Sequence, residues 1–125
     1  MKIKKLTPML WTEQLQETID FYTQTLPFIC RDRNDEWGWA ALHLCEVDIM
    51  LAKPNAQIPF DKPVFTGSFY FEVENVAEWW AQLKDQAQVC YPIETFDWGM
   101  REFAIFDNNG YILQFGEEVA EGQTH

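Results

Sequence analysis

The feature that most constrains the fold of this chain is an internal repeat with an offset of 61 residues. Two apolar stripes with the helical spacing i, i+4, i+7 and i+11 lie that far apart along the 125-residue chain. They consist of Leu15, Ile19, Tyr22 and Leu26, and of Val76, Trp80, Leu83 and Ala87. Under the same offset Thr7 falls on Ser68, and the pair Trp37-Gly38 falls on Trp98-Gly99. Amphipathic helices often share a spacing, but this ordered match of further positions indicates a tandem repeat.

Segments of alternating polarity complete each half of the repeat. Each helix is preceded by one strand-like segment and followed by three, and the predicted strands are 3–11, 28–33, 39–44 and 47–52, then 68–74, 89–95, 101–106 and 111–116. The offset grows to about 64 at the last strand, because the turn at 107–110 is longer than the one at 45–46. The pair Asn75 and Glu78 predicts a capping box for the second helix.

The pattern predicts an α+β fold of two tandem βαβββ modules that form a curved mixed sheet around a cleft. We expect one domain over residues 1–125, with module 1 at about 3–52, module 2 at about 64–118 and a polar tail at 119–125. Residues 53–63 are interpreted as the linker, because three prolines in eleven residues disfavour a regular helix or strand.

Composition excludes several functional classes. Hydrophobic residues make up 47% of the chain and charged residues 23%, which indicates a globular protein. The 9 basic and 20 acidic residues give a net charge of −11, so nucleic acid is not expected as a partner. No apolar run is long enough to span a membrane, and a cytoplasmic location is expected.

Residues with catalytic potential are few. Cys30, Cys45 and Cys90 are odd in number and widely spaced, which favours reduced core thiols over disulfides or a metal site. His43, the only internal histidine, is interpreted as a hydrogen-bonded strand residue rather than a base. The sequence also has no nucleophile elbow and no phosphate-binding glycine loop.

Two motifs resemble those of the glyoxalase/bleomycin-resistance/extradiol-dioxygenase superfamily, also called the vicinal oxygen chelate fold. They are Leu15-x-x-x-Ile19-x-Phe21-Tyr22, and Trp98-Gly99-x-Arg101-x-Phe103-x-x-x-Asp107-x-x-Gly110. The resemblance covers residues 3–118, and the segment 98–103 is most similar to the bleomycin-resistance branch.

The resemblance implies metal-ligand positions on the first and last strand of each module. Here these positions are occupied by Thr7, Met50, Ser68 and Gln114, and only the amide of Gln114 is a ligand type that the family uses. Hydroxyl and thioether groups do not supply the strong donors that a divalent site needs. We therefore expect no bound metal and no cofactor.

Strand alternation predicts which side chains face the cleft. Leu6, Leu10, Ile49, Leu51, Phe69 and Phe71 are expected to face the helices. The predicted ligand-binding set is Trp11, Trp37, Trp39, Asp48, Met50, Tyr70, Glu72, Trp98, Arg101 and Gln114. Aromatic surface mixed with carboxylates suits a planar, cationic small molecule.

Three functions stay open at this point. The leading hypothesis is a metal-free, antibiotic-sequestering protein of the bleomycin-resistance type, with no catalytic residues; the resemblance implies a homodimer. The second is a metal-dependent lyase or dioxygenase of the same superfamily, with an atypical site around Gln114, Asp48 or Glu72. The third is a protein-interaction module that uses the acidic second half, where residues 63–125 carry 11 acidic and 2 basic groups.

Overall fold

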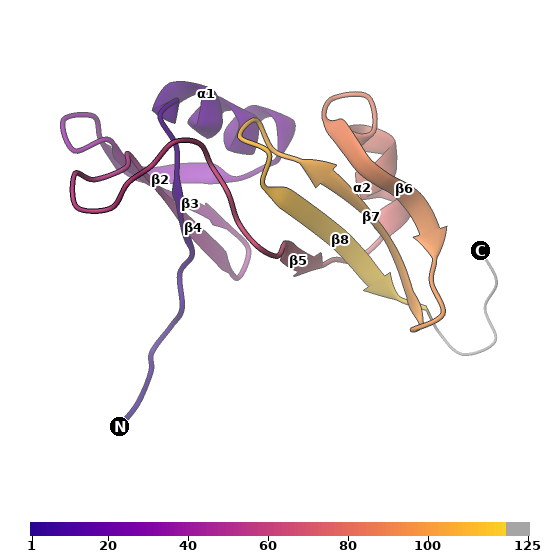
Figure 1. Ribbon diagram of the computed structural model, residues 1–125. Coiled ribbons are helices and arrows are strands. Elements are labelled where there is room, and N and C mark those ends of the chain that lie inside the picture. The colour runs from indigo at the N-terminus through magenta and orange to yellow at the C-terminus, as the bar shows by residue number, and fades with distance from the viewer. Residues whose placement is uncertain (120–125) are drawn as a thin grey trace. The chain divides into compact units, whose positions relative to one another are not determined.

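The computed structural model describes residues 1–119 and divides the chain into two compact units (Figure 1). The first unit is Met1–Pro63 and the second begins at Val64. Residues 53–68 contain no helix or strand. Residues 120–125, most of the predicted polar tail 119–125, lie outside the described residues.

The first unit is a four-stranded mixed sheet with one helical segment on one face. Its strand order is β1-β4-β3-β2, in which β1 runs parallel to β4 and the other pairs are antiparallel. The helical segment passes from an α-helix into a π-helical turn, η1, and packs on one face of the sheet (Figure 1). The elements are β1 Met9–Trp11, α1 Leu15–Asp20, η1 Phe21–Thr25, β2 Ile29–Asn34, β3 Trp39–Leu44 and β4 Val47–Ala52.

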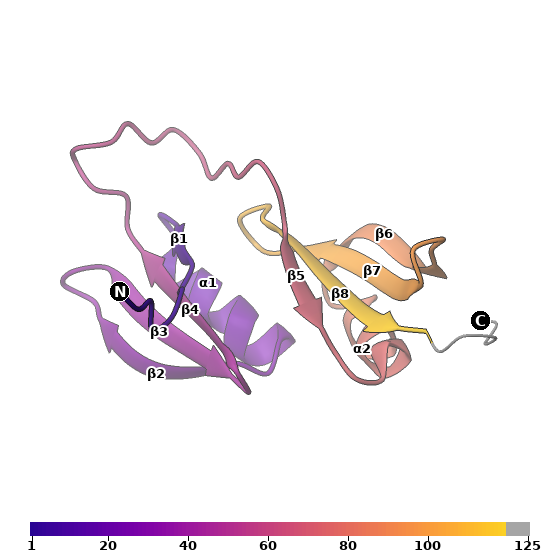
Figure 2. The ribbon, with the colours of Figure 1, turned by 90° about the horizontal axis from the view of Figure 1, so that it is seen from below.

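The second unit repeats this arrangement. Its strand order is β5-β8-β7-β6, with β5 parallel to β8 and the other pairs antiparallel. The helix α2 covers one face of this sheet (Figure 2). The elements are β5 Phe69–Glu72, α2 Val76–Leu83, β6 Gln88–Thr95, β7 Met100–Phe106 and β8 Ile112–Glu118. The predicted α+β class and the two βαβββ modules are thus confirmed.

The strand register shows the repeat at single-residue resolution. Met9 pairs with Met50 in the parallel β1–β4 ladder, and Tyr70 pairs with Gln114 in the parallel β5–β8 ladder. The offsets between these equivalent pairs are 61 and 64, the two values that the sequence predicts.

Each core lies between the helix and the covered face of the sheet. In the first unit Ile49 is 2% exposed, and Leu51 and Tyr22 are fully buried, as the alternation and the helix stripe predict. In the second unit, aromatic rings form the core: Phe103 stacks on Phe115 with ring centroids 5.1 Å apart. Burial of such side chains supplies most of the stabilising free energy of a small domain.

The first strand and the burial of the cysteines differ from expectation. β1 is only three residues long, and Leu6, expected in the core, is 82% exposed. Pro8 has no amide hydrogen to give to a ladder, so regular pairing begins only after it, although its carbonyl accepts the amide of Met50 at 2.8 Å. The three cysteines are unpaired, as expected, but none lies fully in the core: Cys30 and Cys90 are half-buried and Cys45 is exposed in the β3–β4 turn.

The N-terminus of α2 is capped by a side chain of strand β8. The predicted capping box does not form, because Asn75 has a left-handed backbone (φ 57°) and its side chain donates to Glu78 instead of accepting from a helix amide. The carboxylate of Glu117 on β8 accepts the amides of Asn75 at 2.9 Å and Val76 at 3.1 Å. A carboxylate here satisfies orphan donors and complements the helix dipole.

Candidate ligand-binding site

A buried carboxylate occupies the centre of the second sheet, on the face turned away from α2, which we call the helix-free face. Glu102 precedes Phe103 on β7. The ring of Phe103 packs against Trp80 of α2, with 5.2 Å between ring centroids, so Phe103 points to the helix-covered face of the sheet. Alternation therefore turns Glu102 to the helix-free face. The residue is only 2% exposed. Burial of a carboxylate requires polar partners, and its neighbours supply them.

Two aromatic side chains donate to the first oxygen of this carboxylate. The hydroxyl of Tyr70, on β5, donates to Glu102 Oε1 at 3.0 Å, and the indole nitrogen of Trp98, in the β6–β7 turn, donates to the same oxygen at 3.1 Å. Both donors stand at the surface, because Tyr70 is 44% and Trp98 is 65% exposed.

The second oxygen belongs to a deeper chain of hydrogen bonds. The hydroxyl of Tyr91, on β6, donates to Glu102 Oε2, and Gln114 Nε2 on β8 lies 3.4 Å from the same oxygen. Gln114 Nε2 also donates to the Tyr91 hydroxyl at 2.7 Å, and its Oε1 accepts from Ser68. Within residues 1–119, the side chains bonded to Glu102 are all donors, so both carboxylate oxygens act as acceptors.

A glycine makes room for the first of these contacts. An added Cβ on Gly116 of β8 would lie 1.9 Å from the hydroxyl oxygen of Tyr70 and 2.6 Å from its Cζ. Gly116 is the residue opposite Glu102 in the β7–β8 ladder. Tyr70 therefore reaches Glu102 across a stretch of sheet that has no side chain.

The protonation of both phenols is fixed by this surrounding. Partial burial, followed by the hydrogen bond to Glu102, raises the pKa of Tyr70 well above its ordinary value. Burial also raises the pKa of Tyr91 to about 12; the bond from Gln114 opposes this shift and the bond to Glu102 adds to it. Both hydroxyls therefore remain hydrogen-bond donors at neutral pH, and neither acts as a base.

An aromatic wall stands beside the carboxylate. Trp98 stacks on Phe96 with centroids 4.7 Å apart and planes 8° from parallel, and Phe96 meets Tyr91 edge-on at 5.8 Å. The exposed indole face thus lies next to a negative group, an arrangement that attracts cationic rings.

The helix-free face of the first unit carries a different polar group. Asp48 on β4 forms an ion pair with Lys5 and accepts a hydrogen bond from His43 Nδ1 at 2.8 Å. These two bonds, that of Lys5 first, lower the pKa of Asp48 to about 2. Trp39 donates to the sulfur of Met50 at 3.3 Å. His43 is thus a hydrogen-bonded strand residue, as the sequence predicts.

The remaining predicted residues are placed separately. Trp11 lies 6.0 Å from Phe60 between ring centroids, Glu72 is exposed at the end of β5, and Arg101 donates to Thr95 at 3.1 Å. Arg101 precedes Glu102 on a regular strand, so it points to the opposite face and is not part of the Glu102 group.

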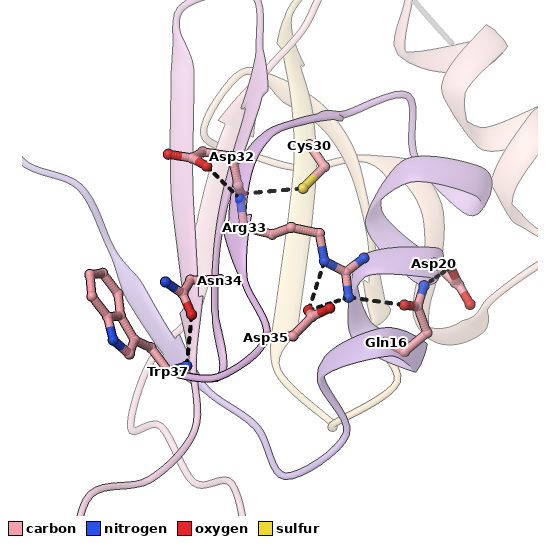
Figure 3. Close-up of polar contacts among 8 residues, drawn as sticks. All are labelled: Gln16, Asp20, Cys30, Asp32, Arg33, Asn34, Asp35 and Trp37. Carbon is pink, nitrogen blue, oxygen red and sulfur yellow. Dashed lines mark hydrogen bonds and ion pairs between the residues drawn. The ribbon is translucent and has the colours of Figure 1, made fainter.

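Trp37 stands on the turn between β2 and β3, in the first unit. It is 72% exposed, and its amide donates to Asn34 Oδ1 at 2.9 Å (Figure 3). Arg33 holds the same turn, because its guanidinium donates to Asp35 at 2.7 Å and to Gln16 of α1 at 3.1 Å (Figure 3).

The structure therefore brings together Tyr70, Trp98 and Gln114 of the predicted set, together with Ser68. Sequence reasoning missed Glu102 and Tyr91, which connect them. Glu102 could have been found, because it is the acidic residue of a mostly apolar strand and shares the alternation phase of Ala104, which pairs with Gln114. No comparable signal marks Tyr91, since β6 has register shifts that break its alternation.

The family follows from a sequence comparison. The model of the glyoxalase/bleomycin resistance protein/dioxygenase superfamily matches residues 3–115. The chain belongs to this superfamily.

Several solved structures share the fold at low sequence identity. A glyoxalase/bleomycin resistance protein/dioxygenase from Nocardioides is 16% identical, with a TM-score of 0.80, over 100% of this chain and 89% of that chain. A lactoylglutathione lyase from Agrobacterium tumefaciens is 16% identical, with a TM-score of 0.70 and 98% of each chain covered. TioX from Micromonospora sp. ML1 is 15% identical, with a TM-score of 0.72 over 96% of this chain and 100% of that chain. Among proteins with curated functions, no match was found.

The superfamily's metal chemistry does not fit these residues. The four family ligand positions hold a hydroxyl, a thioether, a second hydroxyl and an amide, and the amide oxygen of Gln114 already accepts from Ser68. Within residues 1–119, no three His, Cys, Asp or Glu side chains lie close enough to hold a metal ion. Over the same residues, no helix has the length and apolarity needed to cross a bilayer.

Proposed function

We propose that this protein is a small-molecule-binding member of the glyoxalase superfamily that sequesters a planar, cationic ligand without a metal and without catalysis. The ligand lies on the helix-free face of the second unit, against Trp98 and Tyr70, with its positive charge directed to Glu102. Protection by occupancy of this kind is the mode of action expected for a protein of the bleomycin-resistance type.

One observation carries the proposal: the buried carboxylate of Glu102 is held only by neutral donors. The ion pairs among the described residues involve Lys5, Arg33 and His43, all in the first unit, and none reaches Glu102. Hydroxyl, indole and amide groups satisfy hydrogen bonds but do not cancel the charge. A negative charge beside exposed aromatic surface remains available to a cation.

The charge of the second unit acts in the same direction. Residues 64–119 contain 10 acidic and 2 basic side chains. Such an excess draws cations toward the surface and repels anions, and this long-range part weakens with salt. Contact of a cation with an aromatic face adds about 0.5–2 kcal/mol and persists at high salt.

The enzyme hypothesis has less support. Lactoylglutathione lyase shares the fold, but at 16% identity this similarity concerns the fold alone. The donor set lacks the strong metal ligands such a reaction uses, and both phenols are too weakly acidic to serve as bases.

The test is a binding screen with basic aromatic compounds, bleomycin included, read by tryptophan fluorescence and thermal shift. We expect at least one compound to quench the emission, with an affinity that weakens as salt is raised. Glu102→Gln should weaken binding at least tenfold and Trp98→Ala should remove much of the quench. Glu74→Gln, which removes an exposed charge of the same unit, is the matched control and should change little. Exclusive binding of anionic compounds would refute the proposal.

A further inference from the structure

The two oxygens of Glu102 differ in how firmly they are held. Oε2 is bonded by Tyr91 and Gln114, which are half-buried and also bonded to each other at 2.7 Å. Gln114 is fixed further by Ser68. Displacing any member of this group breaks more than one hydrogen bond.

Oε1 is held by side chains that move more easily. Tyr70 and Trp98 are 44% and 65% exposed, and within residues 1–119 each makes a single side-chain hydrogen bond, the one to Oε1. Tyr70 lies above Gly116, where no side chain stands beneath it. Rotation of Tyr70 breaks one hydrogen bond, rotation of Trp98 breaks one hydrogen bond and its stacking on Phe96, and Oε1 loses both donors once the two rings have moved.

From this asymmetry we propose that the ligand binds Oε1 by displacing Tyr70 and Trp98, and that its cationic group carries at least two N–H donors. The inference rests on the proposed function and narrows its ligand class. A buried acceptor left without a partner costs more than an ordinary hydrogen bond contributes, so the ligand must replace both donors that it removes.

The requirement for two N–H donors distinguishes between cations of equal charge. A primary ammonium, an amidinium or a guanidinium offers two or more N–H groups and fits Oε1. A quaternary ammonium has the same charge and binds aromatic rings well, but donates no hydrogen bond. Cation–π attraction alone would allow both N–H-bearing and quaternary cations to bind. Because Oε1 loses two donors on binding, the cations that bear N–H groups are favoured.

The rings of Tyr70 and Trp98 still contact the ligand after they have moved away from Oε1. Trp98 is stacked on Phe96, and the turn that carries both lies at the edge of the site. Tyr70 is the opposite boundary, on β5. The two rings therefore have two roles. In the free protein they donate hydrogen bonds to Oε1, and in the complex they flank the aromatic part of the ligand.

The experiment compares three probes with one ring, one positive charge and a falling number of N–H groups: benzylamine, N,N-dimethylbenzylamine and benzyltrimethylammonium. Affinities are measured by calorimetry at neutral pH. We expect benzylamine to bind at least tenfold more tightly than benzyltrimethylammonium, with the dimethyl compound between them, and Glu102→Gln should abolish the difference. Equal affinities, or affinities that rise with methylation, would overturn the inference.

A pair of tyrosine variants tests the choice of oxygen. Tyr70→Phe removes one donor that the ligand must displace, so it should strengthen benzylamine binding several-fold. Tyr91→Phe makes the same chemical change at Oε2 and should not strengthen it. Equal strengthening in both variants, or weaker binding in Tyr70→Phe, would contradict the assignment to Oε1.

The outcomes separate the two proposals. If all three probes bind equally and Glu102→Gln weakens them all, the proposed function stands and the N–H requirement fails. If none binds at millimolar concentration, the proposed function fails together with the inference. The probe series uses the unmodified protein, so it remains decisive even if a variant does not fold.

Discussion

Substitution of Gly116 by alanine tests the packing on which the site depends. The three atoms nearest to an added Cβ all belong to Tyr70, at 1.9, 2.6 and 3.1 Å, so the ring must move and its bond to Glu102 must break. Gly116 does not have a left-handed backbone, so alanine introduces no backbone strain.

The expected magnitude follows from two opposing effects. A hydrogen bond to a charged group contributes about 1.5–3 kcal/mol, and the lower part of this range applies because water can reach the half-exposed Tyr70. Replacement of glycine at an unstrained position stabilises by about 0.4–1 kcal/mol through the unfolded chain. The free energy of unfolding should therefore fall by about 0.5–1.5 kcal/mol in Gly116→Ala.

A double-mutant cycle isolates the cause. In a Tyr70→Ala background the clash no longer exists, so Gly116→Ala should be neutral or slightly stabilising there. The coupling free energy from urea unfolding should reach about 1 kcal/mol, above the few tenths seen for independent sites. Gly110→Ala, at a left-handed glycine with open space around it, should destabilise equally in both backgrounds. An equal effect of Gly116→Ala in the two backgrounds would refute the packing argument.

Four further predictions follow from single contacts or from composition. Glu117→Gln should lower the free energy of unfolding by about 0.5–2 kcal/mol in urea denaturation because it weakens the cap of α2, whereas its exposed neighbour Glu118→Gln should not. The lowered pKa of Asp48 makes its contribution full above pH about 4 and lost as pH falls through about 2, so Asp48→Asn should flatten the stability profile in that window when the free energy of unfolding is measured against pH. Elemental analysis of protein purified without added metal should find well under one equivalent of transition metal per chain, and a stoichiometric, dialysis-resistant ion would contradict the donor argument. Light scattering should give twice the chain mass of 14.8 kDa at micromolar concentration, and a monomer would rule out the homodimer.

The sequence predicts the order of helices and strands well, because the burial of apolar side chains determines that order. Helix stripes such as Leu15 to Leu26 and alternating strands such as 47–52 must place their apolar side chains on one face, so periodicity alone gives the element order and the register offset. The strands Trp39–Leu44 and Val47–Ala52 have the predicted bounds. The first strand was predicted too long because alternation continues through Leu6 while hydrogen-bonding capacity does not continue through Pro8.

The site was predicted only in part, because hydrogen bonds across strands have no sequence period. Alternation predicts Tyr70, the turn before the seventh strand suggests Trp98, and the family resemblance implies Gln114; the structure brings these three together. Their common acceptor, Glu102, depends on the register of three strands and on the gap above Gly116. The cap of α2 by Glu117 was missed for the same reason, since its partners lie 41 and 42 residues earlier in the chain.

The two modules differ in the groups that they offer to the proposed cationic ligand. Both keep the Trp-Gly turn, with left-handed glycines at φ 70° for Gly38 and 83° for Gly99, so the backbone that presents the indole is retained in each. The offset of 64 at the last strand relates Gly116, the ladder partner of Glu102, to Ala52, whose ladder partner is Trp39, so the first module has no carboxylate at the position equivalent to Glu102. Its own acid, Asp48, is already compensated by Lys5 and His43. A cation gains charge attraction at the second module and would have to displace an existing ion pair at the first. Transferring the carboxylate, by Trp39→Glu in the Glu102→Gln background, should therefore fail to restore binding, since module 1 has Met9 and Met50 at the positions equivalent to Tyr70 and Gln114.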